Sequence, residues 1–280
     1  TVDGLLAGSG PETLRIAALE VVLLRDRNLA VAESKKLLQK GTTFEKQKAL
    51  AMLAKVKMEA GDEALVEQWD AAWKSSGSGK NSKKFPPALL LDLVEAAQSR
   101  KDAAPALQER LDEREKELQP KAGTPAAYEE CLEGGSAKAG REIALQNLTA
   151  NCTACHKFES KDGSNVGPAL NLIGKQKDRP YLLEALVAPA ATIAPGYGVM
   201  TVTLKDGKVL TGNLVASTSK VLQVRLADGA LEKIDTELIA SKTDPITTMP
   251  PMSALLTKRQ IRDLVAYLSG LQGSTKKPAK

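Results

Sequence analysis

The sequence predicts a mainly helical protein of two domains, with a small antiparallel sheet inserted into the second domain. Apolar residues recur with helical spacing through about the first 120 residues and again near the C-terminal end. Between residues 198 and 241 they alternate with a period of two, which is typical of strands. The stretch "QPKAGTP" marks a domain boundary at about residue 122, which gives domains of residues 1–122 and 123–280.

The first domain is expected to be a short helical solenoid. Helical segments follow one another at residues 11–24, 30–39, 44–57, 62–73, 87–100 and 104–118. Residues 17–19 and 51–53 occupy equivalent places about 34 residues apart, a period typical of stacked helix pairs. The Gly-, Ser- and Lys-rich residues 74–87 are expected to form a loop or linker. Trp69 and Trp73 lie one helical turn apart, so we expect them to pack in a core or interface.

The inserted sheet is expected to hold about four antiparallel strands. Asp206-Gly207 and Asp228-Gly229 are tight-turn signals between its alternating runs. A helical stretch precedes the sheet and leads into a cluster of cysteines.

The chain returns to a helix after the sheet. Thr257 and Gln260 match the pattern of a capping box at the start of this helix. Its expected apolar face consists of Ile261, Leu264, Val265, Leu268 and Leu271.

Composition and charge exclude several functional classes. No apolar run approaches the roughly 20 residues of a membrane span, so we expect no transmembrane segment. Only 3% of the residues are aromatic and no basic stripe is interleaved with them, so we expect no nucleic-acid partner. The net charge of +5 and the Lys-rich end "STKKPAK" are expected to reflect a solvated surface rather than a partner site. The chain begins at Thr1 without Met or a signal peptide, which suggests a processed or excised piece.

The segment "NCTACHKF", residues 151–158, concentrates two of the three cysteines and the one histidine. A structural zinc site needs four ligands, and only Cys131 remains to complete the set, so zinc is poorly supported. A thioredoxin-type redox pair would follow a strand, whereas this motif follows a helical segment. Covalent attachment of one haem c fits each residue. Cys152 and Cys155 would bond the two vinyl groups, and His156 would ligate the iron. We expect Cys131 to be a buried small hydrophobe.

The numbers of histidines and methionines limit which residue can ligate the iron on its other face. Because His156 is the single histidine, bis-histidine ligation within one chain is excluded. The ligand on that face must then be Met, Lys, another atom or nothing. Of the five methionines, Met52 and Met58 fall in the helical array with core spacing, and Met200 falls on a predicted strand. Met249 and Met252 fall in the irregular stretch "TTMPPMSALL". The proline after Met249 favours an extended backbone that could lie across a flat cofactor, so Met249 is the predicted ligand and Met252 the runner-up.

Several motifs together resemble the planctomycete-type haem-binding domain found at the C-terminus of large secreted proteins. They are "GGSAKAGREI", "CTACH", "NVGPALNLIG", "RPYLLEALVAPAATIAPGY", "MPP" and "LTKRQIRDLVAYL", and the resemblance covers roughly residues 130–271. In that family the domain is similar to a class I cytochrome c, and it typically follows HEAT-like helical repeats and often a propeller-type dehydrogenase. The resemblance implies a class I cytochrome c fold here, and the sheet resembles a small SH3-like barrel.

The resemblance also implies roles for individual residues. It places the thioether bonds at Cys152 and Cys155, and the axial ligands at His156 and Met249. It implies that the carbonyl of Pro168 accepts a hydrogen bond from the axial histidine.

Other implied roles concern packing and the edge of the cofactor. Gly140 would let the first helix of this domain cross the last one closely near Tyr267. Arg179, Tyr181 and Tyr197 could meet the haem propionates.

The expected function is single-electron transfer by an exported, periplasmic haem c module, rather than an enzyme activity. The expected partners are a dehydrogenase as electron donor and a downstream carrier as acceptor. Two alternatives remain open at this point. One is a haem enzyme or sensor with a labile Met ligand, acting on peroxide or a gas. The other is a protein-binding scaffold built from the helical repeats.

Overall fold

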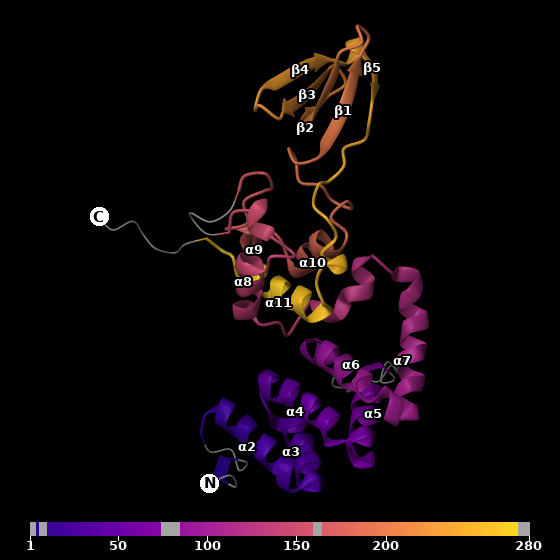
Figure 1. Ribbon diagram of the computed structural model, residues 1–280, viewed down its shortest axis with the longest axis vertical. Helices are drawn as coiled ribbons and strands as arrows, with labels where there is room; N and C mark the ends of the chain where they lie inside the picture. Colours follow the sequence, from indigo (N-terminus) through magenta and orange to yellow (C-terminus); the bar gives the residue numbers. More distant parts are fainter. Residues whose placement is uncertain (1–3, 6–9, 74–84, 159–163, 274–280) are drawn as a thin grey trace, which may run out of the picture. The chain divides into compact units, whose positions relative to one another are not determined.

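The computed structural model describes residues 4–5, 10–73, 85–158 and 164–273 (Figure 1). The described chain is mostly helical and carries one five-stranded antiparallel sheet, which confirms the mainly helical prediction. Residues 74–84 of the predicted linker and the Lys-rich end, residues 274–280, lie outside the described residues. The chain divides into two compact units. The first comprises Thr1–Ala122 and Glu129–Gly134, and the second comprises Gly123–Tyr128 and Gly135–Lys280.

The first unit is built from successive helices. They are α2 (Glu12–Arg25), α3 (Arg27–Lys40), α4 (Thr43–Val56), α5 (Glu59–Trp73), α6 (Leu90–Gln98) and α7 (Pro105–Leu118). Each helix packs against the next in sequence and against the one after that. Local signals mark the starts: Asp26 accepts a hydrogen bond from the N–H of Leu29, and Thr42 and Glu45 form a capping box.

Apolar side chains from these helices form one core. Leu50, Leu53, Leu65, Leu93 and Leu107 are each fully buried in it. Trp69 belongs to the same core, and Trp73 packs against this core. The ring centroids of the two tryptophans are 4.3 Å apart. The expected packing role of the two tryptophans is therefore confirmed.

The helices of the second unit are α8 (Ala137–Gln146), α9 (Ile173–Gln176), α10 (Arg179–Val187) and α11 (Lys258–Ser269). Short 3-10 turns occur at η1 (Pro87–Leu89), η2 (Lys101–Ala103), η3 (Gln119–Lys121), η4 (Pro125–Cys131), η5 (Cys152–Ala154), η6 (Thr236–Leu238) and η7 (Met252–Ala254). Helix α11 begins with the predicted capping box of Thr257 and Gln260. None of the helices in the described ranges is long and apolar enough to cross a membrane.

Helices α8 and α11 cross in close contact, as Figure 1 shows. A Cβ atom at Gly140 would lie 2.0 Å from the carbonyl oxygen of Asp263 and 2.8 Å from the Cβ of Tyr267. Only glycine permits this approach, because real Cβ atoms do not come so close to other heavy atoms. The carboxylate of Asp263 also accepts a hydrogen bond from the N–H of Ser136 at 2.7 Å, just before α8. The expected close crossing at Gly140 near Tyr267 is confirmed.

The sheet has the order β4-β3-β2-β1-β5. Its strands are β1 (Val199–Leu204), β2 (Val209–Ser217), β3 (Val221–Leu226), β4 (Leu231–Asp235) and β5 (Ile239–Lys242). Gly207 and Gly229 take φ of 89° and 90° in the two turns that the sequence predicted. The expected number of about four strands was one too low, because β5 is only four residues long and follows η6 without a tight-turn signal. One face buries Met200, Val202, Leu210, Leu222, Val224 and Ile234.

Candidate functional site

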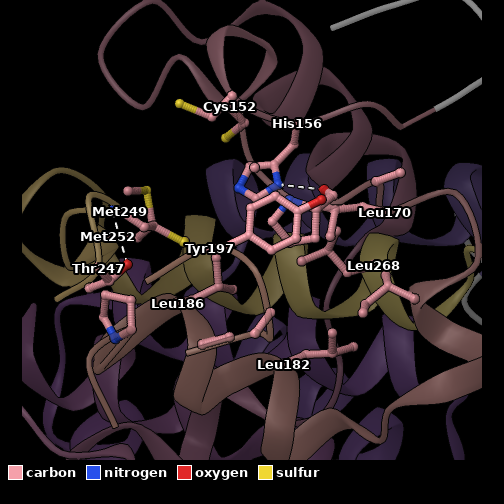
Figure 2. A pocket seen from close by; sticks show the side chains of 18 of the residues that line it. Cys152, His156, Leu170, Leu182, Leu186, Tyr197, Thr247, Met249, Met252 and Leu268 are labelled. Atoms are coloured by element: carbon pink, nitrogen blue, oxygen red, sulfur yellow. Dashed lines mark hydrogen bonds between the residues drawn. The ribbon is translucent and has the colours of Figure 1, made fainter. Parts of the chain in front are cut away.

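The second unit contains a cavity of about 440 Å³ (Figure 2). Its walls come from the cysteine motif, the loop at residues 166–170, helices α10 and α11, and the segments 192–197 and 247–252. The volume lies in the range of about 300–1,000 Å³ typical of cofactor sites. Most lining residues are apolar, and among the described ones Lys177 is the single charged side chain.

The cysteine motif begins with an unusual backbone conformation. Asn151 takes a left-handed φ of 40°, which Asn tolerates better than most residues, and the turn η5 starts directly after it. The N–H of His156 donates to the carbonyl of Cys152 at 2.9 Å, which continues the helical turn. Cys152 and Cys155 are thus one turn apart, both line the cavity, and they are not joined in a disulfide.

His156 points into the same cavity and is held by a hydrogen bond. Its Nδ1 lies 2.8 Å from the carbonyl oxygen of Pro168. A carbonyl can only accept, so Nδ1 carries the proton and donates, and the lone pair is left on Nε2. Burial lowers the pKa of His156, and the hydrogen bond to Pro168 opposes this shift without cancelling it. The imidazole is therefore neutral near pH 7 and can ligate a metal.

Gly167 lies directly against the imidazole. A Cβ at this position would be 2.7 Å from Cε1 and 2.9 Å from Nδ1 of His156. The N–H of Gly167 donates to the carbonyl of Cys155 at 2.6 Å, which ties this loop to the motif. Gly167 belongs to the motif "NVGPALNLIG", but its contact with the ring could not be predicted from that motif.

The thiol of Cys152 is in an apolar setting. Burial raises its pKa, so the thiol stays protonated at neutral pH. Redox-active cysteine pairs depend on a lowered thiol pKa, which makes a thioredoxin-like role poorly supported here.

Cys131 is fully buried in the first unit, as expected of a small hydrophobe. Within the described ranges, no group of three or more His, Cys, Asp or Glu side chains could hold a metal ion.

Two of the five methionines line the cavity, and they are the two in the predicted loop. Met249 is half-buried, and its N–H donates to the hydroxyl of Thr247 at 3.1 Å. Met252 is only 3% exposed, and its carbonyl accepts from the N–H groups of Leu255 and Leu256 within η7 and just after it. The other three pack elsewhere: Met52 and Met58 in the core of the first unit, and Met200 in the sheet.

Not all of the other sequence-predicted residues line the cavity. Pro168 and Tyr197 line the cavity, whereas Arg179, in the first turn of α10, does not. Its neighbours Lys177 and Tyr181 do line it, with the ammonium of Lys177 4.1 Å from the centre of the Tyr181 ring. Lys177 was not among the predicted site residues, because nothing in the local sequence pattern distinguishes it from a surface lysine.

The site thus brings one neutral imidazole, two thiols and two thioethers together around an apolar space. Sulfur ligands and imidazole suit transition metals such as iron, copper and zinc, whereas hard cations prefer oxygen ligands. Neither the models of known protein families nor the curated protein sequences match the chain.

Proposed function

We propose that the chain is a mono-haem c-type cytochrome module that transfers single electrons. One observation carries the proposal. His156, whose Nδ1 is hydrogen-bonded to the carbonyl of Pro168, faces a cavity that is also lined by Cys152, Cys155 and Met249. Bound there, a haem supplies a one-electron iron couple.

The residues present fit this cofactor. Cys152 and Cys155 stand one helical turn apart at the cavity wall, where their thiols can bond two vinyl groups on the same side of a porphyrin. The absence of a side chain on Gly167 leaves room for the His156 ring against the backbone. The cavity volume of about 440 Å³ and its mainly apolar lining suit a large planar group.

The residues that line the cavity would then have distinct roles toward the cofactor. His156 would hold the iron through Nε2, while Pro168 fixes the tautomer and the ring orientation. Met249 would offer its thioether from the segment 247–252, and such a ligand would give a higher reduction potential than a second histidine. The apolar lining excludes water, and Lys177 provides a positive charge that could pair with a propionate.

Features of the fold support the finer assignments. The crossing of α8 and α11 at Gly140 supports a class I cytochrome c fold for the second unit. The regular packing of each helix against its next two neighbours supports HEAT-like repeats in the first unit. The order β4-β3-β2-β1-β5, with η6 before the last strand, supports an SH3-like barrel.

The proposal extends to the setting of the protein. Attachment of haem c takes place outside the cytoplasm, so we place the module in the periplasm or another exported compartment. A dehydrogenase would supply its electrons, and a further carrier would accept them. In this proposal the chain relays electrons and carries out no further chemistry.

A reductive titration of the purified haem-loaded protein tests the proposal. We expect one electron per chain and a six-coordinate, low-spin haem in both oxidation states. A five-coordinate resting haem would instead support a haem enzyme or gas sensor. A chain that is purified without any haem after production with a haem c attachment system would contradict the cofactor assignment itself.

A further inference from the structure

Two chain segments connect the sheet to the cavity, and they run side by side. Residues 194–199 lead into β1, and residues 243–249 leave β5. The first segment carries Tyr197 into the cavity and the second carries Met249 (Figure 2). The position of both cavity residues therefore depends on how these two connections are held.

Backbone hydrogen bonds join the two connections. The N–H of Val199 donates to the carbonyl of Ile246 at 2.8 Å, and the N–H of Ile246 donates to the carbonyl of Val199 at 2.9 Å. One step further into the sheet, the N–H of Thr243 donates to the carbonyl of Thr201 at 3.0 Å. The N–H of Thr201 donates to the hydroxyl of Thr243, also at 3.0 Å. We call these four hydrogen bonds the connecting ladder.

The first connection is in turn fixed to β2. The N–H of Gly196 donates to the carbonyl of Leu214 at 3.1 Å, and the N–H of Leu214 donates to the carbonyl of Gly198 at 2.8 Å. Pro195 and Gly196, with a φ of 87° at Gly196, occupy the centre of a turn of the type II pattern. The N–H of Tyr197 closes that turn on the carbonyl of Ala194 at 3.1 Å.

The two connections are also in steric contact. A Cβ atom at Gly198 would lie 2.8 Å from the Cβ of Pro245. Any larger residue at position 198 must therefore push the second connection away. The spacing of the connections is set both by the ladder and by this contact.

The ladder ends three residues before Met249. After Ile246 the chain passes Thr247, whose hydroxyl accepts from the N–H of Met249. Met252 is anchored differently, because it begins η7 and its carbonyl accepts from the N–H groups of Leu255 and Leu256, just after that turn. The two methionines are thus fixed by different parts of the second unit.

We propose that the sheet positions Met249 as the sixth ligand. It does so through the connecting ladder and through the hydrogen bonds of Leu214 with Gly196 and Gly198. This inference rests on the proposed haem function and assigns a task to the inserted sheet. Ile246, Gly198 and Leu214 are positioning residues: they act on the ligand through the backbone. When the ladder is broken, Met249 leaves the iron more often and the sixth position opens.

The substitution Ile246→Pro tests this directly in the haem-loaded protein. It removes the N–H donor of one ladder bond, while the side chain of Ile246 is 65% exposed and does not line the cavity. The readouts are the far-red methionine-to-iron band of the oxidised protein and carbon monoxide binding by the reduced protein. Loss of one hydrogen bond should raise the open fraction by roughly two- to tenfold. The matched control Ile246→Ala keeps both backbone groups and should keep the band.

A second variant covers the case in which Ile246→Pro does not fold. Gly198→Ala inserts a Cβ against Pro245 and should weaken the band in the same direction. An unchanged band and no carbon monoxide binding in folded, haem-loaded Ile246→Pro, or in Gly198→Ala if that variant alone folds, would overturn the inference. That result would assign the ligation to Met252 or to a loop independent of the sheet. A wild-type protein without covalent haem would instead overturn the proposed function.

Discussion

The imidazole Nδ1 of His156 lies 2.8 Å from the carbonyl oxygen of Pro168, twelve residues further along the chain. This hydrogen bond fixes the tautomer, so that Nε2 is the nitrogen available to a metal. It depends on the position of residues 164–168, where Gly167 lies directly against the ring. The backbone carbonyl of Pro168 thus determines which nitrogen of His156 can ligate a metal.

Gly167→Ala should disturb the axial imidazole. The added Cβ would lie 2.7 Å from Cε1 of His156, so either the ring or the loop must shift. We expect a loss of about 1–3 kcal/mol in the free energy of unfolding, together with a changed haem spectrum. Urea unfolding and visible spectroscopy measure these effects. In the control Gly270→Ala the added Cβ meets atoms no closer than 3.3 Å, so a shift of only a few tenths of an ångström is needed and the loss of stability should be smaller than in Gly167→Ala.

Met249→Ala should abolish the far-red band of the oxidised haem, because it removes the predicted sixth ligand. Met252→Ala should keep the band. It should still cost about 2–5 kcal/mol of stability, because Met252 is only 3% exposed and its removal leaves a cavity. Visible spectroscopy and chemical unfolding of the two variants separate ligation from packing. The reverse pattern would make Met252 the ligand.

Gly140→Ala should force α8 and α11 apart. The new Cβ would be 2.0 Å from the carbonyl oxygen of Asp263, a backbone atom that cannot rotate away. We expect destabilisation of about 3 kcal/mol or more, at the upper end of overpacking effects, and a lower yield of haem-loaded protein. Lys138→Ala, an exposed position on the same helix, is the control and should leave the unfolding midpoint nearly unchanged. Wild-type stability in Gly140→Ala would contradict the observed crossing.

The stability of the first unit should fall in acid through Glu45. Burial alone would raise the pKa of this carboxylate, but hydrogen bonds from Thr42 and the Arg15 guanidinium outweigh burial and hold the pKa below 4.5. Because the pKa is lower in the folded state, the stabilisation is fully present above about pH 4.5 and is lost as the pH falls through the folded value.

Glu45→Gln measures this contribution. Its free energy of unfolding should lie below that of wild type at pH 7, and the gap should close toward pH 3. Glu67→Gln, which alters a side chain 60% exposed, should show a much smaller gap at every pH. A gap for Glu45→Gln that stays constant from pH 7 to pH 3 would be inconsistent with the lowered pKa.

The sequence allowed the site to be predicted where local chemistry is specific. The cysteine motif was interpreted from its own residue types and spacing. The hydrogen bond to Pro168 and the close crossing at Gly140 were implied by the family resemblance, and the structure contains both. Tyr197 was placed by its motif and does line the cavity.

Other features depend on tertiary structure and left no local signal. Whether Lys177 or Arg179 faces the cavity is decided by the exact start of α10, and the two residues look alike in sequence. The short strand β5 forms because β1 offers it an edge, not because of its own pattern. The pairing of Val199 with Ile246 joins residues 47 positions apart, which periodicity cannot reveal.

The central claim is covalent attachment of one haem through Cys152 and Cys155. Intact mass spectrometry of the protein, produced together with a haem c attachment system, tests it most directly. We predict a mass gain of one haem in wild type and in Cys131→Ala, and no stable two-bond attachment in Cys152→Ala or Cys155→Ala. An unmodified wild-type mass, or full attachment in the Cys152→Ala and Cys155→Ala double variant, would contradict the claim.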